Sequence, residues 1–163
     1  GDSFIGLQIL KGKIKVNNKI SKYFIKKYYE PDLQLKFIDN LLKLANTSID
    51  ISDGLIDDLK KMINKQSLSF ELIENKIPIS ENLKKLIIIK QLKKVDLISN
   101  GDDYQILFTA NPKISRIIKN ISKTTGIKIS KIGKIISGKN RSKIIDEKGS
   151  QIVPKNIGYL HQF

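Results

Sequence analysis

The segment Thr47–Leu59 constrains the fold most strongly, because its hydrophobic period changes within a few residues. Residues 48–51 alternate polar and apolar side chains, which is typical of a half-buried strand. A glycine then permits a sharp turn, and the apolar residues that follow recur at helical spacing. The segment therefore predicts a strand, a turn and a helix, with Ser52 or Asp53 as the helix N-cap.

Four carboxylates lie in this one segment, although the chain as a whole has a formal net charge of +14. Asp50 and Asp53 are expected at the end of the strand, beside free N–H groups of the helix that attract phosphate oxygens. Magnesium prefers such carboxylate oxygens, and Ser52 could add a hydroxyl. The alternative is that Ser52 and Asp53 only cap the helix, with Asp57 and Asp58 as solvated charges of its first turn.

A second acidic segment begins at Asn100-Gly101, which predicts a turn. Asp102 and Asp103 follow, and Tyr104–Thr109 is rich in residues that favour strands. From the residues alone, the two aspartates are either part of a binding site or a polar turn before a strand.

The remaining pattern mixes helices and strands without regular alternation, which predicts an α+β fold. A length of 163 residues is expected to form one domain, residues 1–163, with a sizeable core. The expected helices are Asp2–Leu10, Ile20–Tyr29, Leu33–Ala45, Leu55 to about Lys65, Glu81–Gln91 with Ser80 as N-cap, and Asn111 to Gly126. The expected strands are Leu68–Leu72 and Ile127–Ile136, with a hairpin of Lys143–Ile145 and Gln151–Val153.

Composition excludes several classes of function. The absence of cysteine excludes disulfides, thiolate catalysis and cysteine-based zinc sites. No apolar run approaches the ~18 residues of a membrane-spanning helix, and Ile87-Ile88-Ile89 is expected to be buried. No charged segment precedes a signal-like apolar run, so we expect a cytoplasmic protein without a membrane partner.

The basic balance invites comparison with nucleic-acid-binding proteins. The lysines, however, are spread along the whole chain, and only Arg116 and Arg141 are arginine, the residue best suited to reading base edges. Biased composition explains this charge better than a nucleic-acid partner does.

Five stretches of the chain resemble the motifs of one enzyme family, in the same order. They are Gly1-Asp2-Ser3 with Gly6-Leu7, Ser48–Leu55 (SIDISDGL), Asn100–Tyr104 (NGDDY) running into Leu107-Phe108-Thr109, Ile132–Ile135 (IGKI), and Gly158-Tyr159 with His161 and Phe163. They are similar to GDS-x-x-GL, IDISDGL, GGEDYELLFT, IG-x-I and GY-x-HF of the C-terminal domain of thiamine-monophosphate kinase, in the aminoimidazole ribonucleotide synthetase superfamily. The chain departs from this pattern at Asn100 and Asp102, where the family has Gly and Glu, and by an extra Gln162 in the tail.

The resemblance implies a mixed β-sheet layered with α-helices, as in the C-terminal domain of aminoimidazole ribonucleotide synthetase. It also implies the C-terminal half of an enzyme that transfers the γ-phosphoryl group of ATP to thiamine monophosphate, giving thiamine diphosphate. The N-terminal half, which carries further magnesium and ATP ligands and the dimer-forming sheet, would then be absent from this chain. We therefore expect this chain to be inactive alone and the full-length protein to be a homodimer.

Residue by residue, the resemblance assigns Asp50 and Asp53 as Mg²⁺ ligands and Ser52 as an ATP contact. It assigns Asp102 as a substrate contact, and the family's substrate-stacking position falls on Asn156. No catalytic side chain is implied, because an ionised phosphate acceptor needs no strong general base. His161, the single histidine, is expected to be structural.

Two alternatives remain open. A related ATP-dependent synthetase of the same superfamily, acting in selenophosphate or purine synthesis, would share the fold and the ATP chemistry. A non-catalytic domain that binds nucleic acid through its lysines would instead show salt-dependent binding. The combination of IDISDGL, GDDY and the GY-x-H tail favours the thiamine enzyme.

Overall fold

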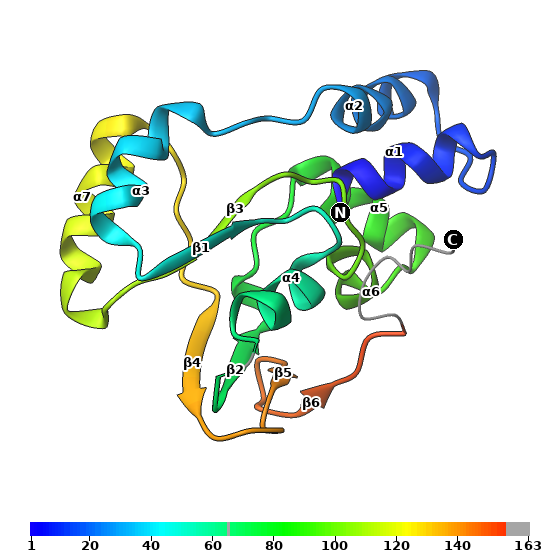
Figure 1. Cartoon of the computed structure of the whole chain (residues 1–163). Coiled ribbons are helices and arrows are strands. Elements are labelled where there is room, and N and C mark those ends of the chain that lie inside the picture. The colour runs from blue at the N-terminus through cyan, green and yellow to red at the C-terminus, as the bar shows by residue number, and fades with distance from the viewer. Residues whose placement is uncertain (65, 156–163) are drawn as a thin grey trace.

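The structure is a computed structural model that describes residues 1–64 and 66–155 (Figure 1). Its helices are α1 Asp2–Leu10, α2 Asn18–Tyr29, α3 Ile38–Leu44, α4 Leu55–Met62, α5 Glu81–Lys90, α6 Lys94–Ile98 and α7 Ser115–Thr125. Its strands are β1 Thr47–Asp50, β2 Leu68–Ile73, β3 Ile106–Thr109, β4 Gly133–Ser137, β5 Lys143–Ile145 and β6 Gln151–Ile152. Short 3₁₀ turns occupy Leu35–Phe37, Glu74–Lys76 and Pro112–Ile114. The expected α+β class is confirmed.

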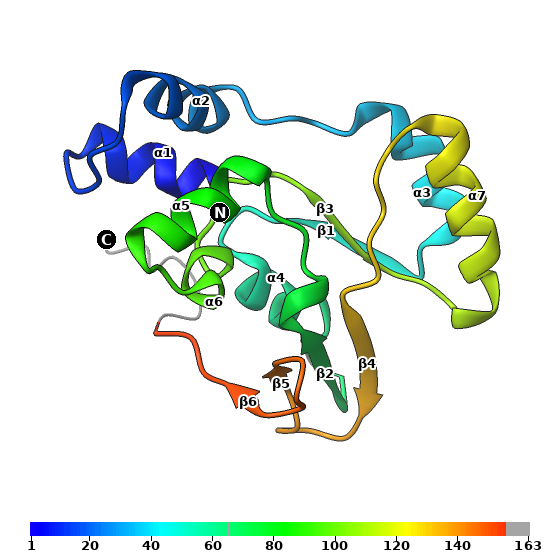
Figure 2. The same cartoon turned by 180° about the vertical axis from the view of Figure 1, so that it is seen from behind.

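The strands form two sheets. β1 and β3 pair antiparallel, with Thr47 opposite Thr109 and Asp50 opposite Ile106. The second sheet has the order β4-β2-β5-β6, in which β2 and β5 are parallel and the other pairs antiparallel. This is the mixed sheet that was expected, and Figures 1 and 2 show the β1–β3 ribbon extending from α4 toward α3 and α7.

Strand β2 is tied to both of its neighbours by one carboxylate. Glu71 forms ion pairs with Lys134 of β4 at 3.1 Å and with Lys143 of β5 at 3.3 Å. The hydrogen bond from Lys134, followed by that from Lys143, lowers the pKa of Glu71 below its usual value. The charge pattern of the strands thus agrees with their order in the sheet.

Helix α4 fills the centre of the larger hydrophobic core. Leu55, Ile56 and Leu59 are buried there against Phe70 and Leu72 of β2. The helix therefore rests with its apolar face on the sheet, which fixes the position of the turn that precedes it.

A second core joins α1, α2, α5 and α6. Its buried members are Ile5, Phe24, Leu83, Leu86 and Leu97. The predicted N-cap of α5 is confirmed, because the Ser80 side chain accepts a hydrogen bond of 3.0 Å from the Leu83 N–H.

Several sequence-based boundaries and burial assignments are wrong. The predicted helix Leu33–Ala45 is a 3₁₀ turn followed by the short α3, whose Leu42 is 80% exposed. Ile88 and Ile89 of α5 are also exposed, because the buried stripe of that helix runs through Leu83 and Leu86 instead. The predicted strand Ile127–Ile136 begins only at Gly133, where it gains a hydrogen-bonded partner in β2.

Within the described ranges, no helix combines the length and the apolar character needed to cross a membrane.

Candidate functional site

The two acidic segments lie side by side and are joined through their backbones. The N–H of Ile51 donates to the Gln105 carbonyl, and the N–H of Tyr104 donates to the Ile51 carbonyl, both at 2.9 Å. One step further along, the Asp102 N–H donates to the Ser52 carbonyl at 2.9 Å. These bonds extend the β1–β3 pairing into the loops, so that the residues of both motifs meet at one end of the ribbon.

Two glycines allow this close approach. A Cβ on Gly54, which has φ +123°, would lie 2.4 Å from the Ser99 carbonyl oxygen. A Cβ on Gly101 would lie 1.9 Å from the Ser52 carbonyl oxygen. Both contacts are with backbone atoms, which cannot swing aside, so each loop requires glycine where it faces the other.

The second loop also has left-handed backbone at two residues with side chains. Asp102 has φ 68° and Tyr104 has φ 48°. Aspartate tolerates this region better than most residues, whereas a tyrosine adopts it rarely. The pairing with Ile51 and Ser52 holds this conformation in place, and strain of this kind clusters at functional sites.

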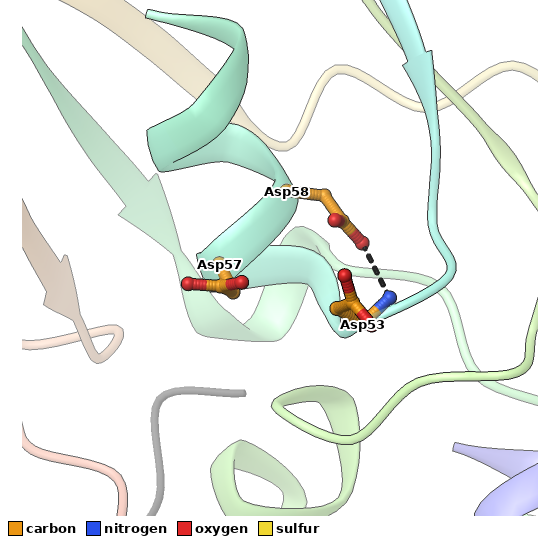
Figure 3. Close-up of side chains that lie close together, drawn as sticks. All are labelled: Asp53, Asp57 and Asp58. Carbon is orange, nitrogen blue, oxygen red and sulfur yellow. Dashed lines mark hydrogen bonds between the residues drawn. The ribbon is translucent and has the colours of Figure 1, made fainter. Parts of the chain in front are cut away.

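Asp58 accepts hydrogen bonds from the backbone of the turn between β1 and α4. Its carboxylate is 1% exposed, and Oδ2 accepts hydrogen bonds from the N–H groups of Ser52, Asp53 and Gly54 at 3.0, 2.9 and 3.1 Å. Figure 3 shows the Asp58 side chain reaching back to the backbone nitrogen of Asp53. A charged acceptor makes each of these bonds stronger than its neutral counterpart.

This arrangement corrects the expected capping of α4. The N-cap is Gly54, without a side-chain cap, so neither Ser52 nor Asp53 has that role. Asp58, one turn into the helix, instead accepts the N–H groups of residues 52–54, which precede it. The alternative in which Asp58 is a solvated charge is therefore wrong.

Lys61 is the counter-ion of the acidic turn. Its ammonium group contacts the carboxylates of Asp53, of Asp57 at 2.9 Å and of Asp58 at 3.1 Å. The hydrogen bond to Asp53, supported by those to Asp57 and Asp58, raises the pKa of Lys61 well above its usual value. Three negative charges thus face one positive charge, which leaves the turn locally acidic.

The ligand oxygens of Asp53, Asp57 and Asp58 lie within 4.8 Å of one another, a spacing that suits one cation (Figure 3). Asp58 is already committed to the backbone and Lys61, whereas the side chains of Asp53 and Asp57 are 25% and 34% exposed. Hard carboxylate oxygens with access to solvent fit Mg²⁺, which keeps several of its waters. The donor set therefore fits the implied metal through Asp53 and Asp57, with Asp58 as support.

The structure places the predicted site residues as follows. Asp50 is the exposed last residue of β1 and lies outside the cluster of three carboxylates. Ser52 and Asp53 are half-buried in the turn, and Asp102 is half-buried in the facing loop. Asn156 and the tail motif with Tyr159 and His161 lie outside the described residues.

Asp58 and Lys61 were missed as functional candidates. The sequence carries a signal for Asp58: it stands three residues after Leu55 and four before Met62, on the apolar face of α4. A charged residue on a buried face needs partners, and Lys61 follows at the i+3 spacing that allows an ion pair.

The first motif stretch reaches the same region. Asp103 accepts hydrogen bonds from the backbone nitrogens of Gly1 and, at 3.3 Å, Ser3. Asp2 accepts from the hydroxyls of Tyr23 and Ser80, both at 2.9 Å. The start of α1 is thereby fixed beside the second acidic loop.

Comparison with known proteins adds to this geometry. No family model matches the chain. The thiamine-monophosphate kinase of Buchnera aphidicola subsp. Schizaphis graminum is 33% identical over 167 residues, which cover 99% of this chain and 50% of that protein. The chain is homologous to the C-terminal half of thiamine-monophosphate kinases. It spans about half the length of the curated kinases that it matches.

Solved structures agree on the fold. The thiamine-monophosphate kinase of Aquifex aeolicus superposes with a TM-score of 0.69 at 23% identity, covering 94% of this chain and 49% of that one. A structure of AaThiL complexed with AMPPCP and TMP gives a TM-score of 0.73 at 23% identity, covering 98% of this chain and 48% of that one. The chain therefore has the fold of these solved thiamine-monophosphate kinase domains.

Proposed function

We propose that the protein to which this chain belongs phosphorylates thiamine monophosphate with ATP, giving thiamine diphosphate. The observation that carries the proposal is the backbone pairing of the two acidic loops, which brings Ser52 and Asp53 beside Asp102. Its kinase homologues support the reaction, and the AaThiL complex with AMPPCP and TMP supports ATP and thiamine monophosphate as the two substrates. The substrates and the activity would be those of a protein of the relatives' full length, about half of which this chain spans.

In this proposal the turn of Ser52 and Asp53 binds Mg²⁺ and ATP, and the facing loop of Asp102 binds thiamine monophosphate. Asp53 would hold Mg²⁺, with Asp57 as a further oxygen donor, and Ser52 would contact ATP. Asp50, at the end of β1 and outside this carboxylate cluster, would be a second Mg²⁺ ligand, as the resemblance implies. Asp102, in the facing loop, and Asn156 contact thiamine monophosphate. Bound Mg²⁺ supplies charge neutralisation between the two anionic substrates.

The chain's own residues would act by binding and alignment. The reaction breaks the bond between the γ-phosphorus and the oxygen that bridges to the β-phosphate, and a phosphate oxygen of thiamine monophosphate bonds to that phosphorus while ADP leaves. The acceptor is already ionised, so the site needs no strong base. Fixing the Ser52 and Asp102 loops against each other holds donor and acceptor in line, which is the main protein contribution to such a reaction.

The rest of the proposal concerns the whole protein. The relatives' other half would supply further ATP and magnesium ligands, so this chain alone would be inactive. The intact protein would be a cytoplasmic homodimer of such two-domain chains.

The test is to replace Asp50 and Asp53 separately by asparagine in the intact protein. Each change removes a charged ligand and keeps the shape of the side chain, so we expect thiamine diphosphate formation to fall by ~10²-fold. The exposed Asp39→Asn on α3 serves as the control. Wild-type rates in both site variants would show that these two aspartates are not metal ligands.

A further inference from the structure

We propose that Asp58 is a positioning residue, whose buried carboxylate fixes the turn that presents Ser52 and Asp53 to the nucleotide and metal. The inference rests on the proposed function, in which Ser52 contacts ATP and Asp53 contacts Mg²⁺. It assigns to Asp58 a role that differs from that of its exposed neighbour, Asp57.

The contacts of Asp58 leave it little capacity to act as a ligand itself. Its Oδ2 accepts three backbone N–H groups within 3.1 Å, and its Oδ1 accepts the Lys61 ammonium group at 3.1 Å. With the residue 1% exposed, a cation would have to displace these partners and enter the core. Asp58 therefore acts through the turn that it holds.

The carbonyl oxygens and the N–H groups of the turn have different partners. Residues 51 and 52 are anchored through their carbonyl oxygens to the loop of Asp102 and Tyr104. The N–H groups of residues 52–54 point the other way, toward Asp58. Removing the charged acceptor would leave two partly buried donors and one buried donor unsatisfied, so the turn would rearrange to reach water.

The packing of α4 fixes where the Asp58 carboxylate lies. Leu55, Leu59 and Met62 are buried around Asp58 on the same face of the helix. The packing of α4 in the core therefore fixes the Asp58 carboxylate, and the hydrogen bonds to this carboxylate fix the position of the turn. Lys61 adds a second link, because it contacts both Asp58 and Asp53.

Hydrogen exchange in the intact protein tests the structural step, with Asp58→Asn compared with Asp57→Asn. Both variants remove one charge from the same cluster, and only Asp58 contacts the backbone of the turn. We expect exchange at the amides of residues 52–54 to accelerate by about tenfold or more in Asp58→Asn and to stay within about twofold in Asp57→Asn. Equal exchange in the two variants, or acceleration spread evenly over the chain, would overturn the proposal.

Binding of Mn²⁺ together with a non-hydrolysable ATP analogue, followed by electron paramagnetic resonance, tests the functional step. Asp58→Asn should weaken Mn²⁺ binding by about tenfold in the wild-type background and by much less in an Asp53→Asn background, because its effect passes through Asp53. Additive losses would instead make Asp58 an independent ligand and overturn the positioning role. Unchanged Mn²⁺ affinity despite faster exchange would overturn it as well.

Failure of the proposed function gives a different result. If the wild-type protein phosphorylates no thiamine monophosphate yet binds Mn²⁺ with the nucleotide, the positioning role stands and the substrate assignment fails. If Asp58→Asn does not fold, the wild-type protein still decides the structural step. Amides of residues 52–54 that exchange as fast as free loop amides would show that the three hydrogen bonds to Asp58 are absent in solution.

Discussion

At the residue scale, the site depends on how one lysine and three aspartates share their charge. Lys61 contacts Asp53, Asp57 and Asp58. The same three carboxylates would also attract a metal cation. The lysine is 45% exposed, so it can leave the carboxylates at little cost in burial. Lys61 therefore offsets the charge of the three carboxylates and would compete with a metal bound by them.

The corresponding prediction concerns Lys61→Met, which removes the charge and keeps the aliphatic stem. We expect Mn²⁺ affinity to rise severalfold at low ionic strength, with a smaller gain at high salt, because the competing charge is gone and salt screens what remains. Lys60→Met, at an exposed position one residue earlier, is the matched control. Calorimetric titration measures both variants, and a fall in affinity for Lys61→Met would show that the lysine assists metal binding.

A second residue-scale prediction concerns Asp102, which stands where the family has glutamate. In the intact protein, Asp102→Ala should raise the KM for thiamine monophosphate about ten- to a hundredfold, the usual effect of losing a hydrogen bond to a charged group. The KM for ATP should stay nearly constant. Steady-state kinetics with each substrate varied in turn measures both values, and an effect confined to ATP would move Asp102 to the nucleotide side of the site.

At the scale of elements, the site is a junction between the end of β1, the start of α4 and the loop before β3. Gly54 and Gly101 set the separation of the two loops, since an added Cβ would overlap backbone on the facing loop in each case. The junction therefore depends on the lack of a Cβ at these two glycines as much as on the acidic side chains around them.

Gly101→Ala is predicted to separate the loops. The added methyl group would lie 1.9 Å from the Ser52 carbonyl oxygen, so we expect a loss of roughly 3 kcal/mol in the free energy of unfolding, at the upper end for overpacking. Gly12→Ala is the control, because its Cβ meets nothing within 4 Å and only its φ of +69° costs energy, about 1 kcal/mol. Urea unfolding of both variants measures the difference, and equal losses would contradict the close packing of the loops.

The elements differ in how far the sequence could predict them. α5 was predicted closely because Ser80 caps it and its apolar residues recur at helical spacing. α3 was predicted too long, since its leucines suggested a buried face that the described chain leaves exposed at Leu35 and Leu42. Residues 127–131 alternate like a strand but have no strand partner in the described part of the chain, and the pairing with β2 starts only at the Ile132 carbonyl, which accepts from the Ile73 N–H at 2.9 Å. Pairing is a tertiary property that alternation cannot supply.

For the candidate site, the sequence could indicate the two acidic segments but not how they are arranged. The acidic segments and their glycines could be read from the sequence, and the structure brings both segments together. The buried role of Asp58 could not be separated from solvated helix charges without knowing which face of α4 rests on the sheet. The facing of Gly54 and Gly101 depends on the β1–β3 register, which no local pattern specifies.

At the scale of the whole molecule, the chain has the fold and about half the length of its curated relatives. Its exposed apolar side chains include Leu35, Ile38 and Leu42 around α3, and Ile117 on α7, and Figures 1 and 2 both show these two helices side by side. If these side chains form one continuous patch, that patch would be a candidate interaction surface. In a protein of the relatives' full length, we expect the additional half to cover part of these side chains and, under the proposed function, to complete the nucleotide site.

The most direct measurement is the formation of thiamine diphosphate from ATP and thiamine monophosphate, followed by chromatography. The intact protein and the 163-residue chain would be compared at equal concentration, with and without Mg²⁺. The account predicts Mg²⁺-dependent product from the intact protein and none above background from the chain alone. An intact protein that consumes no ATP in the presence of thiamine monophosphate and Mg²⁺ would contradict the proposed function.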